Sequence, residues 1–127
     1  MKSIFIIILL FFHFENSFAQ KLSVEIFNKT GYDLDSILIN NGIYIGSIKI
    51  DSSIIIKNIE FIQIQDELPF TKPIATIKNK KRGAPFGYCG TGVKYIKTGS
   101  YKFDILIEDF DTGYHLMWRK HNKSITK

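Results

Sequence analysis

Short segments of alternating apolar and polar residues recur along most of the chain, and they limit the choice of fold sharply. Every second residue from Leu22 to Ile26 is aliphatic, a period of two that is typical of a half-buried β-strand. The clearest segment runs from Ser100 to Glu108, and its apolar face holds Tyr101, Phe103, Ile105 and Ile107. No segment predicts a helix, so we expect a fold built from strands.

The remaining expected strands cover residues 36–40, 43–50, 53–57, 60–65, 74–78, 93–97 and 114–120. Asn41-Gly42 predicts a hairpin, and Gly46 predicts a bulge or a close approach. We expect loops or turns at 66–73, 79–83 and 109–113. Seven to nine short strands with frequent turns predict an all-β fold, a single antiparallel β-sandwich of the immunoglobulin-like or transthyretin-like kind.

The first nineteen residues have the pattern of a secretory signal peptide. Lys2 precedes an apolar run over residues 4–12, and Ser17-Phe18-Ala19 offers small residues before a cleavage point at Gln20. The run is shorter than the roughly 20 residues of a membrane-spanning helix. The alternative is a buried N-terminal strand or helix. We expect cleavage, a secreted or periplasmic product without a transmembrane segment, and one domain over residues 20–127.

Cys89 is the single cysteine, so it has no partner for a disulfide within the chain. It stands in the glycine-rich segment 87–92, and His115 or His121 would be needed to hold it as a reactive thiolate. Cys89 with His115 is therefore a catalytic candidate. A packed core cysteine and a disulfide between two molecules are the alternatives.

The chain carries a formal net charge of +5, and its cations gather in two places. One cluster lies at 78–82 and the other toward the C-terminus, from Arg119 to Lys127. We interpret them as a solvated hairpin tip and a frayed tail, although envelope lipids or acidic glycans would also attract them. Nucleic acid is not an expected partner.

Aromatic and acidic residues near turns are the candidates for ligand contact. Tyr32 and Tyr88 offer faces for sugars or protein, while Asp33 and Asp35 would meet a cation or a basic partner. The acids at 109–113 do not follow the spacing of an EF-hand, and the glycines at 87–92 do not form a phosphate loop. We expect no metal site and no cofactor.

Three segments together carry a resemblance: residues 28–36, Tyr44-Ile45-Gly46, and Cys89-Gly90-Thr91-Gly92 ahead of an alternating aromatic strand. They resemble small exported β-sandwich proteins of Bacteroidota bacteria, a family of unknown function. The resemblance implies a bacterial exported β-domain and transfers no active site.

The features favour a non-enzymatic binding module of the bacterial envelope, which recognises a protein or glycan through loops or a sheet edge. The first alternative is a small thiol-dependent enzyme that uses Cys89 with His115. The second is a structural protein that associates with itself through edge strands such as residues 53–57.

Overall fold

The computed structural model describes residues 21–40, 42–83, 90–110 and 113–122, and strands are the only regular elements among them. The expected signal peptide and Tyr88-Cys89 lie outside these ranges. The strands are β1 (Leu22–Asn28), β2 (Leu34–Ile39), β3 (Ile43–Ile48), β4 (Ser53–Ile59), β5 (Ile62–Gln65), β6 (Leu68–Pro69), β7 (Ile74–Ile77), β8 (Lys80–Arg82), β9 (Lys94–Ile96), β10 (Ser100–Phe110) and β11 (Gly113–Lys120). In the described part of the chain, no helix is long and apolar enough to cross a membrane.

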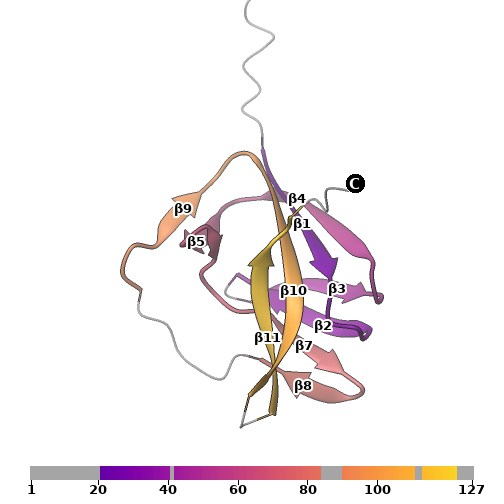
Figure 1. The fold of residues 1–127 in the computed structure, drawn as a ribbon. Helices are drawn as coiled ribbons and strands as arrows, with labels where there is room; N and C mark the ends of the chain where they lie inside the picture. Colours follow the sequence, from indigo (N-terminus) through magenta and orange to yellow (C-terminus); the bar gives the residue numbers. More distant parts are fainter. Residues whose placement is uncertain (1–20, 41, 84–89, 111–112, 123–127) are drawn as a thin grey trace, which may run out of the picture.

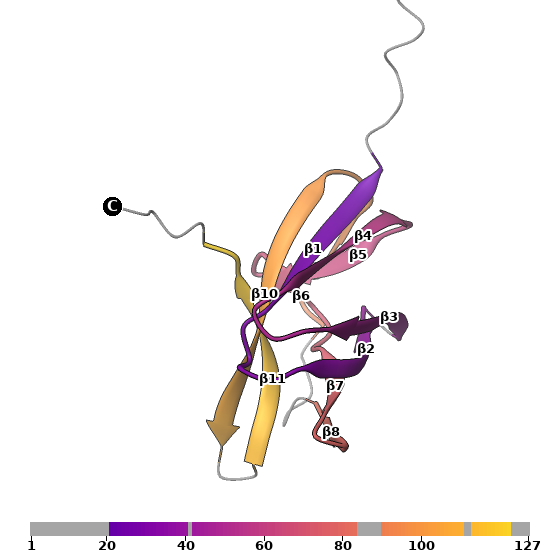
Figure 2. The same ribbon diagram turned by 90° about the vertical axis from the view of Figure 1, so that its right-hand side faces the viewer.

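The strands form three sheets around one core (Figure 1). Their orders are β11-β10-β1-β4, β3-β2-β7-β8 and β6-β5-β9. The first sheet makes one layer, and Figure 2 shows β2, β3, β7 and β8 to one side of it. All three sheets contribute to a single apolar cluster, so the second layer is divided but the core is not. The expected all-β sandwich is confirmed.

Alternation places the core as the sequence predicts. Along β1 the side chains are in turn buried and half-buried, with Leu22, Val24 and Ile26 fully buried. On β10, Phe103 and Ile105 are buried on the same face. Gly46 lies opposite Ile37 with a φ of 86°, where the β2–β3 pairing is irregular. The bulge expected at this glycine is therefore confirmed.

The described residues form eleven strands where seven to nine were expected, because two predicted turn regions contain short strands. The 66–73 region contains β6, and the 79–83 region contains β8. Two-residue turns make both hairpins possible, since Asp66-Glu67 and Lys78-Asn79 adopt positive φ at both positions. None of these residues is glycine, so the sequence did not predict the two hairpins.

One strand pair departs from the expected antiparallel arrangement. β1 pairs with β10 in parallel, in a register that runs from Ser23 opposite Ser100 to Asn28 opposite Ile105. The same strand pairs with β4 antiparallel on its other side. A parallel pair needs a long connection, and the chain between β1 and β10 supplies it. β1 therefore joins the N-terminal and C-terminal parts of the fold in one sheet.

Candidate functional site

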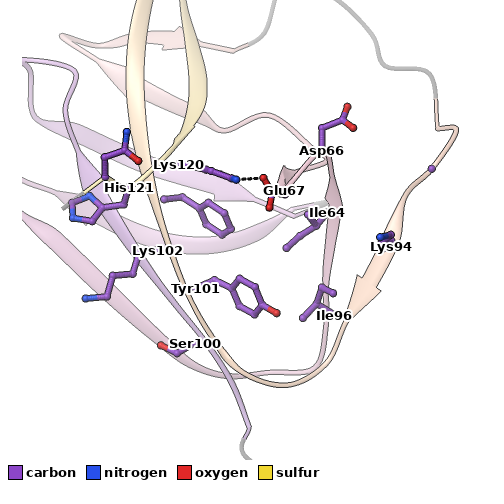
Figure 3. A pocket seen from close by; sticks show the side chains of 13 residues that line it. Ile64, Asp66, Glu67, Lys94, Ile96, Ser100, Tyr101, Lys102, Lys120 and His121 are labelled. Carbon is purple, nitrogen blue, oxygen red and sulfur yellow. Dashed lines mark hydrogen bonds and ion pairs between the residues drawn. The ribbon is translucent and has the colours of Figure 1, made fainter. Parts of the chain in front are cut away.

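A cleft with a volume of about 810 Å³ opens where the beginning of β10 and the end of β11 face the small β6-β5-β9 sheet (Figure 3). This volume lies within the range of small-molecule sites. The described residues that line it are Ile64, Asp66, Glu67, Gly92, Lys94, Ile96, Ser100, Tyr101, Lys102, Phe103, Lys120, His121 and Asn122.

Two aromatic rings form the floor of the cleft. Tyr101 and Phe103 project from the same face of β10, with ring centroids 6.4 Å apart and an interplanar angle of 9°. Phe103 is buried and meets Trp118 edge to face, at 6.0 Å between centroids. Trp118 is itself fixed, since its indole N–H donates to the Thr71 carbonyl at 2.7 Å. Tyr101 is only half-buried, so its ring is the one that a ligand can contact.

Charged side chains of both signs form the rim of the cleft. The positive φ values of Asp66 and Glu67 turn the chain from β5 to β6 and place both acids at the cleft. Lys120, at the end of β11, makes an ion pair with Glu67 across it (Figure 3). Lys94 approaches from β9. The rim can therefore both donate and accept hydrogen bonds.

Lys102 lines the cleft behind the rim, and its side chain lies on the face of the sheet turned away from the core. Its ammonium lies 3.1 Å from Glu25, and the Ser53 hydroxyl donates to Glu25 at 2.9 Å. Desolvation raises the pKa of Glu25, but the hydrogen bonds from Lys102 and Ser53 outweigh it. The net result is a pKa below the ordinary value of 4.5. Lys102 is thus held in place by a carboxylate that stays charged.

A buried carboxylate on the same outer face fixes the end of β11. Asp104 is 3% exposed, and Arg119 donates to its Oδ2 from Nε at 3.2 Å and from Nη2 at 2.8 Å. The Nδ1 of His121 lies 2.6 Å from its Oδ1. His121 also stacks on Phe27, with 3.8 Å between ring centroids. Because His121 lines the cleft, this cluster fixes one of its borders.

The three sequence-predicted binding residues that the structure describes, Tyr32, Asp33 and Asp35, lie away from this cleft. Tyr32 is at the surface, and the Lys78 ammonium sits 4.9 Å from its ring centroid. Asp33 accepts hydrogen bonds from the Lys49 ammonium at 2.8 Å and from the Ile50 amide at 2.9 Å. These two contacts, in that order of strength, hold the pKa of Asp33 below its ordinary value of 3.8. Asp35 is exposed on β2.

The proposed pairing of Cys89 with His115 stays a prediction, because Tyr88 and Cys89 lie outside the described residues. His115 is half-buried on β11, opposite Glu108. Its Nδ1 lies 3.1 Å from the Gly83 carbonyl. Across the described part of the chain, no three histidine, cysteine or acidic side chains gather where they could hold a metal ion.

Sequence reasoning missed the cleft because its aromatic residues were assigned to the core. Tyr101 follows the same alternation as the buried Phe103 and Ile105, and nothing in that pattern marks its position at the end of the core. The break at Thr98-Gly99 was the available signal. β10 begins directly after this break, and its first apolar residue, Tyr101, is half-buried.

Comparison with known proteins identifies no family. No family model matches the chain, and no characterised protein sequence matches it. Among solved structures, the fold is similar to the NMR structure of a protein from Eubacterium rectale, at 10% sequence identity and a TM-score of 0.45. That match covers 84% of this chain and 93% of the other. A likeness this distant carries no argument about function.

Proposed function

We propose that this chain is an exported, non-enzymatic binding protein that takes a glycan into the cleft at the beginning of β10. One observation carries the proposal: an aromatic floor that includes the half-buried Tyr101 lies within a rim that holds the Lys120–Glu67 ion pair. The chemistry of the site is suited to binding, and binding alone accounts for the arrangement of its side chains.

The ligand class follows from the two kinds of surface in the cleft. A sugar ring has an apolar face that packs on an aromatic ring, while its hydroxyls need donors and acceptors around it. Tyr101 supplies the ring, and the Lys120–Glu67 pair supplies both kinds of polar group. Because that pair neutralises itself, the rim favours polar hydroxyls over a strongly charged ligand.

The cleft can be tested by NMR titration of the ¹⁵N-labelled mature chain with a panel of neutral oligosaccharides. We expect at least one to bind with a Kd of about 1 mM or tighter, with shifts in the amides of residues 64–67, 94–96 and 100–103. Tyr101→Leu should weaken binding about tenfold, in line with the loss of an aromatic contact.

Tyr95→Leu is the matched control for this substitution. Tyr95 is 60% exposed, and its hydroxyl accepts from Gln63, but alternation along β9 directs it away from the cleft that Lys94 and Ile96 line. Equal losses in the two variants would contradict the proposal. So would shifts that avoid the cleft, or a panel that produces none.

The export step rests on the sequence pattern of residues 1–19 and on the resemblance to exported Bacteroidota proteins. We expect expression of the full chain in a bacterial host to yield a periplasmic or secreted product that begins at Gln20. Mass spectrometry of the fractionated cells would measure its N-terminus. An intact N-terminus in the cytoplasmic fraction would contradict export, and it would leave the cleft proposal standing.

Self-association is a second candidate function, and the position of β4 favours it. β4 is the last strand of its sheet, and Ile55 on it is 55% exposed. An open strand edge with exposed aliphatic residues is a template for pairing with another chain. Sedimentation should then show dimers that Ile55→Lys abolishes. A strict monomer at all concentrations would remove this candidate.

A further inference from the structure

A second, smaller pocket lies toward the end of β10, the strand whose beginning lines the cleft. Its lining residues differ chemically from those of the cleft. It has a volume of about 170 Å³, below the usual range for drug-sized ligands, so it suits a single chemical group. The described residues that line it are Tyr32, Ile77, Lys78, Lys80, Arg82 and Ile107. Three of them are cationic and none is acidic.

Strand register directs the cations of β8 into this pocket. Lys80 lies opposite Ile77 and Arg82 opposite Ala75, so both share the face of the hairpin that looks toward the core. Lys81 lies opposite Thr76 and therefore points to the other face. The basic cluster expected as a solvated hairpin tip thus has two distinct sides.

The turn of the hairpin adds a third cation and an aromatic wall. Lys78 has a φ of 47°, and its ammonium lies 4.9 Å from the centroid of the Tyr32 ring. A cation held over an aromatic face keeps its positive charge available to a ligand on its other side. Tyr32 thereby places Lys78 near Lys80 and Arg82.

The loop that carries Tyr32 is fixed by a buried asparagine. Asn28 is fully buried, and its amide donates to the carbonyls of Tyr32 at 2.7 Å and Ile48 at 3.0 Å. Its Oδ1 accepts from both the amide and the hydroxyl of Thr30. Gly31 completes the turn with a φ of 82°. One wall of the pocket is therefore organised before any ligand arrives.

We propose that this pocket is an anion site that binds one phosphate or sulfate group, with Lys80 and Arg82 as its principal contacts. A guanidinium and an ammonium provide the charge-assisted hydrogen bonds that such groups accept. Asp109 is an acid that would oppose anion binding here. It follows Ile107 on the same face of β10, about 7 Å further along the strand. The site is independent of the glycan proposal.

The test is an NMR titration with inorganic phosphate and, separately, inorganic sulfate, at constant ionic strength so that screening does not change. We expect saturable shifts in the amides of Tyr32 and residues 77–82. The double variant Lys80→Gln/Arg82→Gln should lose about tenfold or more in affinity. Lys81→Gln removes one charge from the same hairpin on its opposite face, so its affinity should stay within about twofold.

Asp109→Asn sharpens the test in the opposite direction, because removing the nearby negative charge should strengthen anion binding. A sulfated oligosaccharide provides a second arm. Tighter binding than free sulfate assigns the group to a larger molecule, and equal binding assigns the site to the free ion.

Inward-facing charges on an edge strand also discourage unwanted pairing, and that role alone would need no anion. Two outcomes would overturn the anion-site proposal and favour this edge-protecting role instead. One is shifts that do not saturate, and the other is a loss in Lys81→Gln as large as in the double variant. Thermal unfolding of each variant confirms that a lost signal does not reflect a lost fold.

Discussion

The two ends of β10 present opposite chemistry on one continuous strand face. At its beginning, Tyr101 and Phe103 form the floor of a cleft whose Lys120 is paired with Glu67. Toward its end, Ile107 borders a pocket with three cations and no acid among its described lining residues. Between them Ile105 is fully buried, so the core separates the two sites.

The difference shows that neighbours, and not the lysines themselves, set the character of each site. A lysine beside a carboxylate becomes one half of a neutral hydrogen-bonding pair, as at Lys120. Lysines that share a hollow with an arginine concentrate positive potential there. The first arrangement suits uncharged polar ligands and the second suits anions.

The largest expected effect comes from Asp104, which lies on the opposite face of β10 between the two sites. Asp104→Ala removes the hydrogen bonds that Arg119 and His121 make to one buried carboxylate, and it should lower the free energy of unfolding by about 3 kcal/mol. Both sites should weaken together, because each depends on β10. Chemical denaturation measures the change.

Asp35→Ala is the control for this prediction, since it removes an exposed strand aspartate and should change stability by less than about 0.5 kcal/mol. Similar results for the two variants would contradict the role assigned to the Asp104 cluster.

Asn28→Ala should separate the two sites. The substitution leaves the carbonyls of Tyr32 and Ile48 without their donor in a buried position, at a cost of about 2 kcal/mol. The loop that carries Tyr32 should loosen, so phosphate binding should weaken while oligosaccharide binding persists. Parallel titrations of the two ligands measure this.

Thr30→Val provides a graded version, since it removes only the hydroxyl that bonds Asn28. We expect a loss of about 1 kcal/mol. An equal loss of oligosaccharide binding in either variant would show that the two sites are not independent.

The smallest expected effect is a pH dependence of stability, and it arises from Glu25 at the cleft end of the sheet. The pKa of Glu25 is lowered in the folded state, so its contribution is complete above 4.5 and is lost as the pH falls through the folded-state pKa. Stability should therefore decline on acidification below about pH 4.5, by up to about 1 kcal/mol from this pair.

Denaturation at several pH values checks this, and Glu25→Gln should flatten part of the slope. Asp33 shifts in the same direction and will add to the decline, so Asp33→Asn should be measured beside it. A slope that Glu25→Gln leaves unchanged would exclude Glu25 as a source.

Most of the strands were predictable from the sequence, because alternation reports directly on a half-buried strand. β1 and β10 were expected at their observed starts, Leu22 and Ser100. The strands β6 and β8 were not, since Asp66-Glu67 and Lys78-Asn79 do not carry the glycine that usually marks a two-residue turn.

The sites were less predictable than the strands. Tyr32 was identified from the sequence, and it does line a pocket. Its partners Lys80 and Arg82 were interpreted as a solvated tip, because the register that separates them from Lys81 requires a strand that the sequence concealed. The cleft was missed altogether, since its floor residues look like core.

The sequence by itself determined that this chain forms strands, which residues face the core, and that its single cysteine has no partner within the chain. Those properties are local, because they depend on the period of two along a strand and on residue counts. Only the tertiary structure decided the parallel pairing of β1 with β10 and the placement of the two sites. Such features depend on which distant strands become neighbours, and alternation does not encode that choice.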